Sequence, residues 1–381
     1  MTDAVQTCDV LVVGLGALGS AASYWAAERG LRVVGLERFE LGHARGASED
    51  HSRIIRRTYP TTDYVRFAQG AFDAWAAVEE ESGERLVLRT GGLDLFPAES
   101  ADDLDAYVAA MEAEGVVHEV LDAAEVTARW PQWRLPVNLR ALFQPDAGIV
   151  AASLANATHR RLALSHGATL LGETPVRSIR PDGEGYAVET DGGTFRAGAL
   201  VVTADAWTDE ALAPFGVSFR LRVQQEQVTY HDAADAAAFD PSVFPVWIWH
   251  TDPHVYGLPN FGLPGPKVAL HGAGPKTTAD TRTFEPDPRY AAEVAAFVAE
   301  HLPSAAGPPL EVKTCLYTLT PDRHFVLDRV PGQQAAVVGL GTAHAFKFAS
   351  VFGKALVELA VDGSSAWAFP RFSATRGGLG I

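Results

Sequence analysis

The 381-residue chain contains only two cysteines, Cys8 and Cys315. Two cysteines cannot build a disulfide framework, and no cysteine and histidine spacing in the sequence fits a zinc site, so we predict no metal centre. Acidic residues outnumber basic residues by 47 to 31, which gives a formal net charge of −16. This balance argues against nucleic acids and anionic membranes as partners, because both require basic surfaces.

Long apolar runs are missing as well. No stretch approaches the roughly 20 apolar residues of a membrane-spanning helix. The opening MTDAVQTCDV has no basic region followed by an apolar core, as a secretory signal would have. The composition, with 47% hydrophobic and 20% charged residues, is that of a globular protein. We therefore expect a soluble cytoplasmic protein of two domains or one elaborated domain.

Residues 9–39, DVLVVGLGALGSAASYWAAERGLRVVGLERF, follow the order of a dinucleotide-binding unit: strand, glycine-rich turn, helix and second strand. The apolar run at 10–13 predicts a buried parallel strand. We expect the first glycine of the turn to permit a tight bend, the second to let a pyrophosphate approach the backbone, and the third to pack helix against strand. The turn has the GxGxxG spacing and contains Gly14, Gly16 and Gly19.

Glu37 ends the second predicted strand, 18 positions after Gly19. A carboxylate at this place accepts hydrogen bonds from a ribose and repels a 2′-phosphate. The pattern therefore favours FAD or NAD over NADP, and by itself it leaves the choice between FAD and NAD open.

Four arginines and two histidines gather in HARGASEDHSRIIRRTYP, residues 43–60. Arg53 and Arg56 bracket two isoleucines in this run. The run is compatible with a solvated basic loop, or with a buried turn that holds both guanidinium groups beside a ligand. Arginine forks suit carboxylates, so the second interpretation predicts an anionic ligand.

Cys315 stands in the polar and aromatic segment KTCLYTLTPD, residues 313–322. A lone cysteine is usually a small buried apolar residue. Its thiolate is also a nucleophile, a metal ligand or an attachment point, and Lys313 nearby would lower the pKa of the thiol. We expect Cys8, beside the first strand, to serve packing.

Residues 9–60 and 313–350 together resemble the monomeric sarcosine oxidase family of FAD-dependent amine oxidases. This family is related to N-methyltryptophan oxidase and lies within the D-amino-acid-oxidase-like superfamily. The resemblance runs nearly end to end, through the glycine-rich unit, SRIIRRTY, RWP, VYGLPNFG, KTCLYTLTPDRHFVLD and GLGTAHAFKF. It implies an α/β fold in which a Rossmann-like FAD-binding domain is interleaved with an antiparallel-sheet substrate domain. We expect a monomer.

The resemblance also assigns expected roles. Cys315 matches the cysteine that attaches FAD covalently through the flavin 8α-methyl group, and Val176 lies near the adenine end. Arg56 and Lys347 match the pair that binds the substrate carboxylate. Lys267 matches the lysine that helps reduced flavin react with oxygen, although its Gly/Pro-rich surroundings alone predict a surface lysine. The other matched positions lie near the flavin or line the substrate cavity, and they are Arg53, His344, Tyr256, His271 and Tyr317.

Three places depart from the family pattern. Ala343 and Ala345 replace two glycines of the family's SGHGFKF segment. Ser48 and Glu49 stand where sarcosine oxidases have two histidines, and Asp205 replaces a usual glycine near the FAD pyrophosphate. These differences hardly affect the cofactor, but they put sarcosine itself in doubt as the substrate.

We assign residues 1–90, 146–215 and 313–381 to the FAD-binding domain, and residues 91–145 and 216–312 to the substrate domain. The two domains are therefore interleaved along the chain.

The expected activity is oxidation of a secondary or cyclic amino acid by oxygen. The uncharged amine would lose a hydride equivalent from the carbon beside nitrogen, the imine would hydrolyse, and hydrogen peroxide would form, with no obligatory general base. A cyclic imino acid of the pipecolate or piperideine-carboxylate kind, as in secondary metabolism, and a fructosyl amino acid are alternative substrates. Two further alternatives fit the sequence less well. If the protein were a non-catalytic dinucleotide-binding regulator, Cys315, Lys267 and the Arg56–Lys347 pair would have no shared role. If it were an NAD-dependent dehydrogenase, it would need no cysteine to tether the cofactor.

Overall fold

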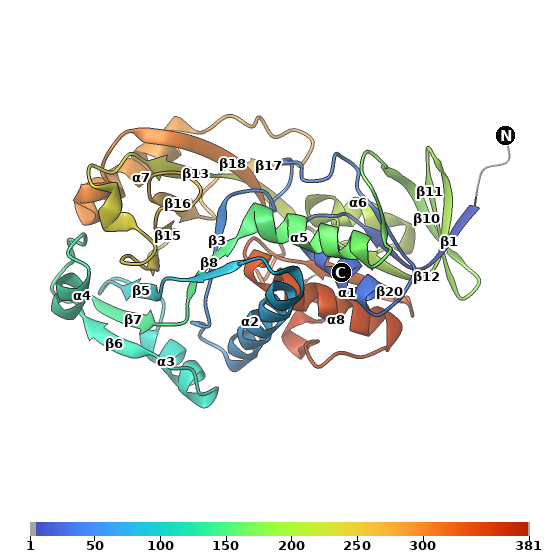
Figure 1. Cartoon of the computed structure of the whole chain (residues 1–381), viewed down its shortest axis with the longest axis horizontal. Helices are drawn as coiled ribbons and strands as arrows, with labels where there is room; N and C mark the ends of the chain where they lie inside the picture. The colour runs from blue at the N-terminus through green and yellow to red at the C-terminus, as the bar shows by residue number, and fades with distance from the viewer. Residues whose placement is uncertain (1–4, 380–381) are drawn as a thin grey trace.

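The computed structural model describes residues 5–379, which form two large sheets and one small sheet (Figure 1). The first large sheet has eight strands in the order β10-β11-β12-β1-β2-β9, with β20 beside β12 and β19 beside β20. Its strands are β1 (Val5–Val13), β2 (Val33–Leu36), β9 (Thr169–Leu171), β10 (Val176–Asp182), β11 (Gly185–Thr190), β12 (Gly193–Val202), β19 (Val326–Arg329) and β20 (Ala336–Leu340).

The central strand β1 runs parallel to both of its neighbours, β12 and β2. Its side chains alternate between two apolar cores, with Val10 and Val12 in one and Leu11 and Val13 in the other. A strand that is covered on both faces has a continuous apolar sequence and not an alternating one. The predicted buried strand at 10–13 is therefore confirmed.

Helices cover one face of this sheet, and α1 begins directly after the glycine-rich turn. Gly14 has φ +90°, which favours glycine, and a Cβ on Gly19 would lie 1.8 Å from the Gly14 carbonyl oxygen. The tight bend and the close packing of helix against strand end are thus as predicted. The helices packed here are α1 (Ala17–Glu28), α2 (Thr62–Ser82), α5 (Ala152–Ser165) and α8 (Ala349–Val361).

The second large sheet has nine strands in the order β17-β13-β16-β15-β14-β5-β7-β6, and β18 pairs with the other edge of β13. All of its pairs are antiparallel except β14 with β5. Its strands are β5 (Gly92–Phe96), β6 (Glu119–Asp122), β7 (Arg140–Gln144), β13 (Arg222–His231), β14 (Val246–Trp249), β15 (His254–Leu258), β16 (Lys267–His271), β17 (Lys276–Thr277) and β18 (Pro309–Leu319). The remaining α-helices are α3 (Leu104–Ala113), α4 (Ala123–Arg129), α6 (Thr208–Leu212) and α7 (Pro288–His301).

In Figure 1 the eight-stranded sheet lies at the right and the nine-stranded sheet at the left, and β18, in orange, extends from the left toward the middle. The predicted fold class, a Rossmann-like parallel sheet combined with a largely antiparallel second sheet, is confirmed. The domain boundaries stay a prediction. The strand that carries Cys315, β18, pairs with β13 and therefore belongs to the nine-stranded sheet. Within residues 5–379, no helix is long and apolar enough to cross a membrane.

A small third sheet joins β3 (Ser52–Ile55), β8 (Gly148–Ala151) and β4 (Val87–Arg89). The SRII segment is therefore a strand and neither a loop nor a turn, but Arg53 and Arg56 line one cavity, as the second interpretation predicted. Ile54 and Ile55 pack into two different apolar clusters, which an extended chain with side chains on opposite faces allows. The strand carries Arg53, and Arg56 follows it directly.

Candidate active site

A cavity of about 360 Å³ is lined by residues from all three sheets, and a second cavity of about 170 Å³ lies next to it. The two are continuous, because five residues line both. The shared residues are Gly16, Ala47, Ser48, Thr203 and Asp205.

Residues of the glycine-rich unit line the smaller cavity, together with Glu37 and Val176. Glu37 is buried and accepts hydrogen bonds from the backbone N–H groups of Leu15 (2.8 Å) and Phe39 (3.1 Å), while His43 Nε2 lies 3.2 Å from its carboxylate. Burial opposes ionisation, but these contacts, that of His43 above all, hold the pKa of Glu37 below its ordinary value. The end of the smaller cavity thus has an ionised acceptor suited to a ribose hydroxyl.

The glycine-rich turn fits a diphosphate. The backbone from Gly14 to Gly16 lines the smaller cavity without any Cβ at either glycine, and the first residues of α1 line the larger one. A Cβ on Gly16 would lie 2.9 Å from Ser48 Oγ and would close this approach. The glycines, the Glu37 carboxylate and the continuous cavity together fit an adenine dinucleotide whose second half occupies the larger cavity.

One buried carboxylate, Asp50, binds two cations on the wall of the larger cavity. It accepts hydrogen bonds from Lys267 Nζ (2.5 Å), Arg53 Nη1 (3.0 Å) and the hydroxyl of Tyr230 (2.8 Å). Burial raises the pKa of Asp50, but the charges of Lys267 and Arg53 outweigh it and hold the pKa well below its usual range. Lys267 is only 2% exposed, so it is not a surface lysine. With Arg53, Lys267 and ionised Asp50, the cluster has a net charge of +1.

A second pair of cations, Arg56 and Lys347, lines the same cavity. Arg56 Nη1 donates to Asp94 Oδ1 (3.0 Å) and to the carbonyl of Thr58, whereas Arg56 Nε is buried and has no hydrogen-bond partner among residues 5–379. Lys347 Nζ donates to the carbonyl of His344 (2.9 Å). Burial, reinforced by the charges of Arg56 and Arg53, lowers the pKa of Lys347 to about 7.

These two side chains present unused donors to one space. Arg56 Nη2 has no hydrogen-bond partner among residues 5–379, whereas Nε is buried, and Lys347 has no carboxylate within ion-pair distance in the described part of the chain. A buried cation without a counter-ion is unfavourable. The arrangement therefore fits a ligand with one carboxylate.

Cys315 lies on β18, opposite Glu226 of β13, and lines the larger cavity. Burial raises the pKa of its thiol to about 11, and the chief cations acting against this are Arg53 and Lys267. Lys313 lines the same cavity, with its Nζ 3.1 Å from His51, 3.5 Å from Glu311 and 3.9 Å from Asp50, and its effect on the thiol stays a prediction. Cys8 is buried and lines neither cavity, in agreement with packing.

The predicted aromatic and histidine residues also meet at the larger cavity. His271 Nδ1 lies 3.3 Å from the Tyr317 hydroxyl, and the His271 ring is 6.5 Å from that of Tyr256. Burial lowers the pKa of His271 to about 3 and the pKa of His344 well below its ordinary value, so both imidazoles are neutral near pH 7. All the predicted site residues thus line one of the two cavities except Gly19, which lies behind the turn. The chemical roles of these residues stay predictions.

The departures from the family pattern lie on the cavity walls. Ala343 has φ +75° and Asp205 has φ +46°, a backbone region that favours glycine and costs other residues roughly 1–2 kcal/mol. The chain therefore keeps a glycine-like backbone at 343 while adding a methyl group to the larger cavity, and Ala345 lines it as well. Burial raises the pKa of Asp205 to about 6. Ser48 Oγ accepts a hydrogen bond from the Ala17 N–H (2.9 Å) at the start of α1.

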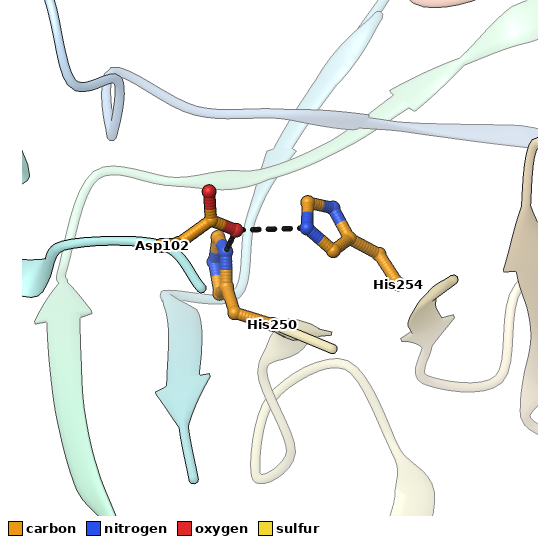
Figure 2. Close-up of side chains that lie close together, drawn as sticks. All are labelled: Asp102, His250 and His254. Carbon is orange, nitrogen blue, oxygen red and sulfur yellow. Dashed lines mark hydrogen bonds and ion pairs between the residues drawn. The ribbon is translucent and has the colours of Figure 1, made fainter. Parts of the chain in front are cut away.

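The sequence interpretation missed the acidic and histidine residues behind these cations. Asp50 and Asp94 are buried carboxylates, and the one local signal for Asp94 is an acidic residue inside the apolar strand β5. Figure 2 shows three more, with Asp102 accepting hydrogen bonds from His250 Nδ1 (2.9 Å) and His254 Nε2 (2.8 Å). Their facing atoms lie within 4.8 Å of one another, close enough for a metal ion, but these hydrogen bonds already satisfy them.

Comparison with known proteins assigns this geometry to a family. The profile of the DAO family, described as FAD dependent oxidoreductase, matches residues 9–359. Over 376 residues the chain is 31% identical to monomeric sarcosine oxidase from Bacillus sp. (strain NS-129), with 97% of each chain covered. It is 32% identical to peroxisomal sarcosine oxidase from Homo sapiens, with 97% and 96% covered.

Solved structures of related oxidases have the same fold as this chain. The open form of NikD, described as an unusual amino acid oxidase essential for nikkomycin biosynthesis, matches with a TM-score of 0.84 and 28% identity, covering 97% of each chain. Glycine oxidase from Geobacillus kaustophilus shares the fold, with a TM-score of 0.82 at 22% identity over 97% of this chain and 99% of that one.

The charge state of Lys347 predicts a pH-dependent affinity for carboxylates. Below pH 7 its ammonium is protonated and attracts an anion, and above pH 7 the proton is lost. The dissociation constant of methoxyacetate, a monocarboxylate without an amine, should therefore rise about tenfold per pH unit above about pH 7. Isothermal titration calorimetry at pH 6 to 9 measures this. Lys347→Met should flatten the profile, whereas Lys354→Met, a change outside both cavities, should not. Affinity that is constant up to pH 9 in the unmodified protein would contradict the assignment.

Proposed function

The chain belongs to the DAO family of FAD-dependent oxidoreductases, and we propose that its substrate is a secondary amino acid, either N-methylated or cyclic. The observation that carries this proposal is the meeting of Arg56, with an unpaired Nη2, and Lys347 in a cavity that adjoins the dinucleotide site. The sarcosine oxidases at 31% and 32% identity support it, because their names specify an N-methylated amino acid.

Substrate recognition follows from the charges of this pair. Arg56 supplies the N–H donors of its Nη2 to the substrate carboxylate, and Lys347 supplies a point charge from another element. The imidazoles of His271 and His344 are neutral near pH 7, so Arg56 and Lys347 supply the positive charge on this side of the cavity, and that charge favours the uncharged form of the amine. A substrate held by its carboxylate is thereby oriented for reaction at the carbon next to nitrogen.

FAD, when bound, accepts the two electrons of that C–H bond and passes them on to oxygen, which yields hydrogen peroxide. The protein residues supply binding, orientation and charge. In this proposal Lys267 and Arg53, with a net charge of +1 after pairing with Asp50, stabilise negative charge that develops when oxygen is reduced. Cys315 would hold the cofactor as a thioether.

The substrate class is tested by a peroxide-coupled screen of N-methyl amino acids, cyclic imino acids and fructosyl amino acids on the purified protein. We expect the highest kcat/KM for a secondary amine with a carboxylate. Arg56→Gln and Lys347→Met should each lower kcat/KM by about tenfold to hundredfold, as the loss of a charge-assisted hydrogen bond does. Amines without a carboxylate should be insensitive to both changes. Equal effects on substrates with and without a carboxylate would refute the assignment.

Covalent attachment of FAD predicts that the flavin stays with the protein on denaturation. Acid-precipitated protein should be yellow, and its mass should exceed that of the polypeptide by one FAD. Cys315→Ala should release the flavin into the supernatant, because no other nucleophilic sulfur lines either cavity. Cys8→Ala is the matched control and should keep its flavin. A colourless pellet from the unmodified protein would rule out the thioether.

Lys267 is expected to serve the reaction with oxygen more than the oxidation of the amine. Lys267→Met should slow flavin reoxidation by about 10²–10³, the usual cost of removing a preorganised charge from a developing anion. Anaerobic reduction by substrate should change much less, and stopped-flow absorbance separates the two half-reactions. Lys276→Met removes an exposed lysine nearby in sequence and should change neither rate. Equal slowing of both half-reactions would make Lys267 a structural residue.

A further inference from the structure

Arg56 is one end of a chain of five hydrogen-bonded side chains that runs behind the cavity wall. Asp94 Oδ1 accepts from Arg56 Nη1 (3.0 Å) and from His250 Nε2 (2.8 Å). His250 Nδ1 donates to Asp102, and His254 Nε2 donates to the same oxygen of Asp102 (Figure 2). The two ends, Arg56 and His254, line the cavity, whereas the three middle residues do not.

Asp94 and His250 are the buried part of this chain, whereas the Asp102 side chain is 34% exposed. The His250 side chain is 1% exposed and that of Asp94 is 2% exposed. The His250 ring stacks on Phe96, with centroids 4.1 Å apart and planes 8° apart, and Tyr107 covers its edge. Side chains packed in this way have one available rotamer, so the Asp94 carboxylate is held in place independently of any ligand.

The charges of the chain balance. His250 places a ring nitrogen against a carboxylate on each side, and only the imidazolium form can donate from both nitrogens. Burial opposes this form, but Asp102 and Asp94 raise the pKa of His250 above its ordinary value. Arg56 and His250 then contribute +2, and Asp94 and Asp102 contribute −2. The negative charge of Asp94 near a substrate carboxylate is therefore balanced by the positive charges of Arg56 and His250.

We propose that Asp94, held by His250 and Asp102, is a positioning residue that fixes Arg56 by its Nη1 and leaves Nη2 free for the substrate carboxylate. Without Asp94, Arg56 would keep the Thr58 carbonyl and its cation–π contact with Tyr59 (4.8 Å), but it would lose the carboxylate that fixes the direction of Nη1. This inference rests on the proposed function, since it assumes that Arg56 binds the carboxylate. It also makes the correct orientation of Arg56 depend on residues of β5 and of the segment between β14 and β15.

Binding of methoxyacetate to the FAD-loaded protein, measured by isothermal titration calorimetry, tests the proposal. Asp94→Ala removes the acceptor and should raise the dissociation constant about tenfold. Asp94→Asn keeps an acceptor oxygen for Arg56 and should stay within about threefold of the unmodified protein. Asp146→Asn is the matched control, because it removes the carboxylate partner of the adjacent Arg57 outside the cavity, and it should change nothing.

The direction in which the dissociation constant changes shows whether Asp94 positions Arg56 or only screens its charge. If Asp94 merely weakened the field of Arg56, both Asp94 variants would bind methoxyacetate more tightly, and this result would overturn the proposal. In an Arg56→Met background, Asp94→Ala should have no further effect, and an undiminished tenfold loss would also overturn it. If Arg56→Met alone leaves binding unchanged, the carboxylate assignment of the proposed function fails instead.

A second variant covers the case in which Asp94→Ala does not fold. His250→Gln can donate to one carboxylate but cannot bridge both, so the dissociation constant should rise at least threefold, and a cooperative thermal transition of the flavin-containing protein shows that this variant folds. If this variant binds methoxyacetate as tightly as the unmodified protein does, the proposed positioning role of Asp94 and His250 is contradicted.

Discussion

The cavity depends on the pairing of buried cations with a smaller number of buried carboxylates. Arg53 and Lys267 share Asp50, and Arg56 is held by Asp94, so each cation has a partner on the protein side. A buried charge without a partner costs several kcal/mol, and a fully paired set would have no use for a ligand. The cavity combines three cations that are paired with carboxylates and one, Lys347, whose Nζ contacts only a backbone carbonyl. Lys347 can therefore attract an anionic ligand.

The fold places this charge arrangement where the sheets meet. The eight-stranded sheet and the turn before α1 supply the dinucleotide site, while β16 and β18 of the nine-stranded sheet bring Lys267 and Cys315 to the same cavity. The small sheet carries Arg53 between them. Because hydrogen-bonded strands and buried ion pairs hold Arg53 and Lys267, the relative positions of these cations are set before any ligand binds, which lowers the cost of binding.

The differences from the sarcosine oxidase pattern change the shape of the cavity more than its charge. Ala343 occupies a backbone conformation that favours glycine, so a methyl group is added to the wall without a change of path. The Ser48 hydroxyl accepts a hydrogen bond from the backbone N–H of Ala17 at the start of α1. The cations that face the substrate, Arg56 and Lys347, are retained. A carboxylate with a differently shaped amine is the substrate that such a cavity would favour.

Local sequence determined the dinucleotide unit. The run from Val10 to Val13 and the spacing of Gly14, Gly16 and Gly19 encode a strand, a turn and a helix through contacts between near neighbours in the chain, and the structure agrees with them. The site residues beyond this unit were found because their surrounding segments resemble a known family. Taken alone, the Gly/Pro-rich surroundings of Lys267 predicted a surface lysine.

Only the tertiary structure decided which charges are paired. Asp50 and Lys267 are 217 positions apart, and Asp94 and His250 are 156 apart, and no periodicity in the sequence connects them. The strand at Arg53 was misread because its basic side chains indicate solvent, whereas its neighbours in space supply buried carboxylates. An acidic residue in an apolar strand, such as Asp94, is unfavourable until the fold brings Arg56 and His250 to it. Hydrogen bonds between side chains distant in sequence therefore decided the orientation of the site, because their energy exists only once the chain has folded.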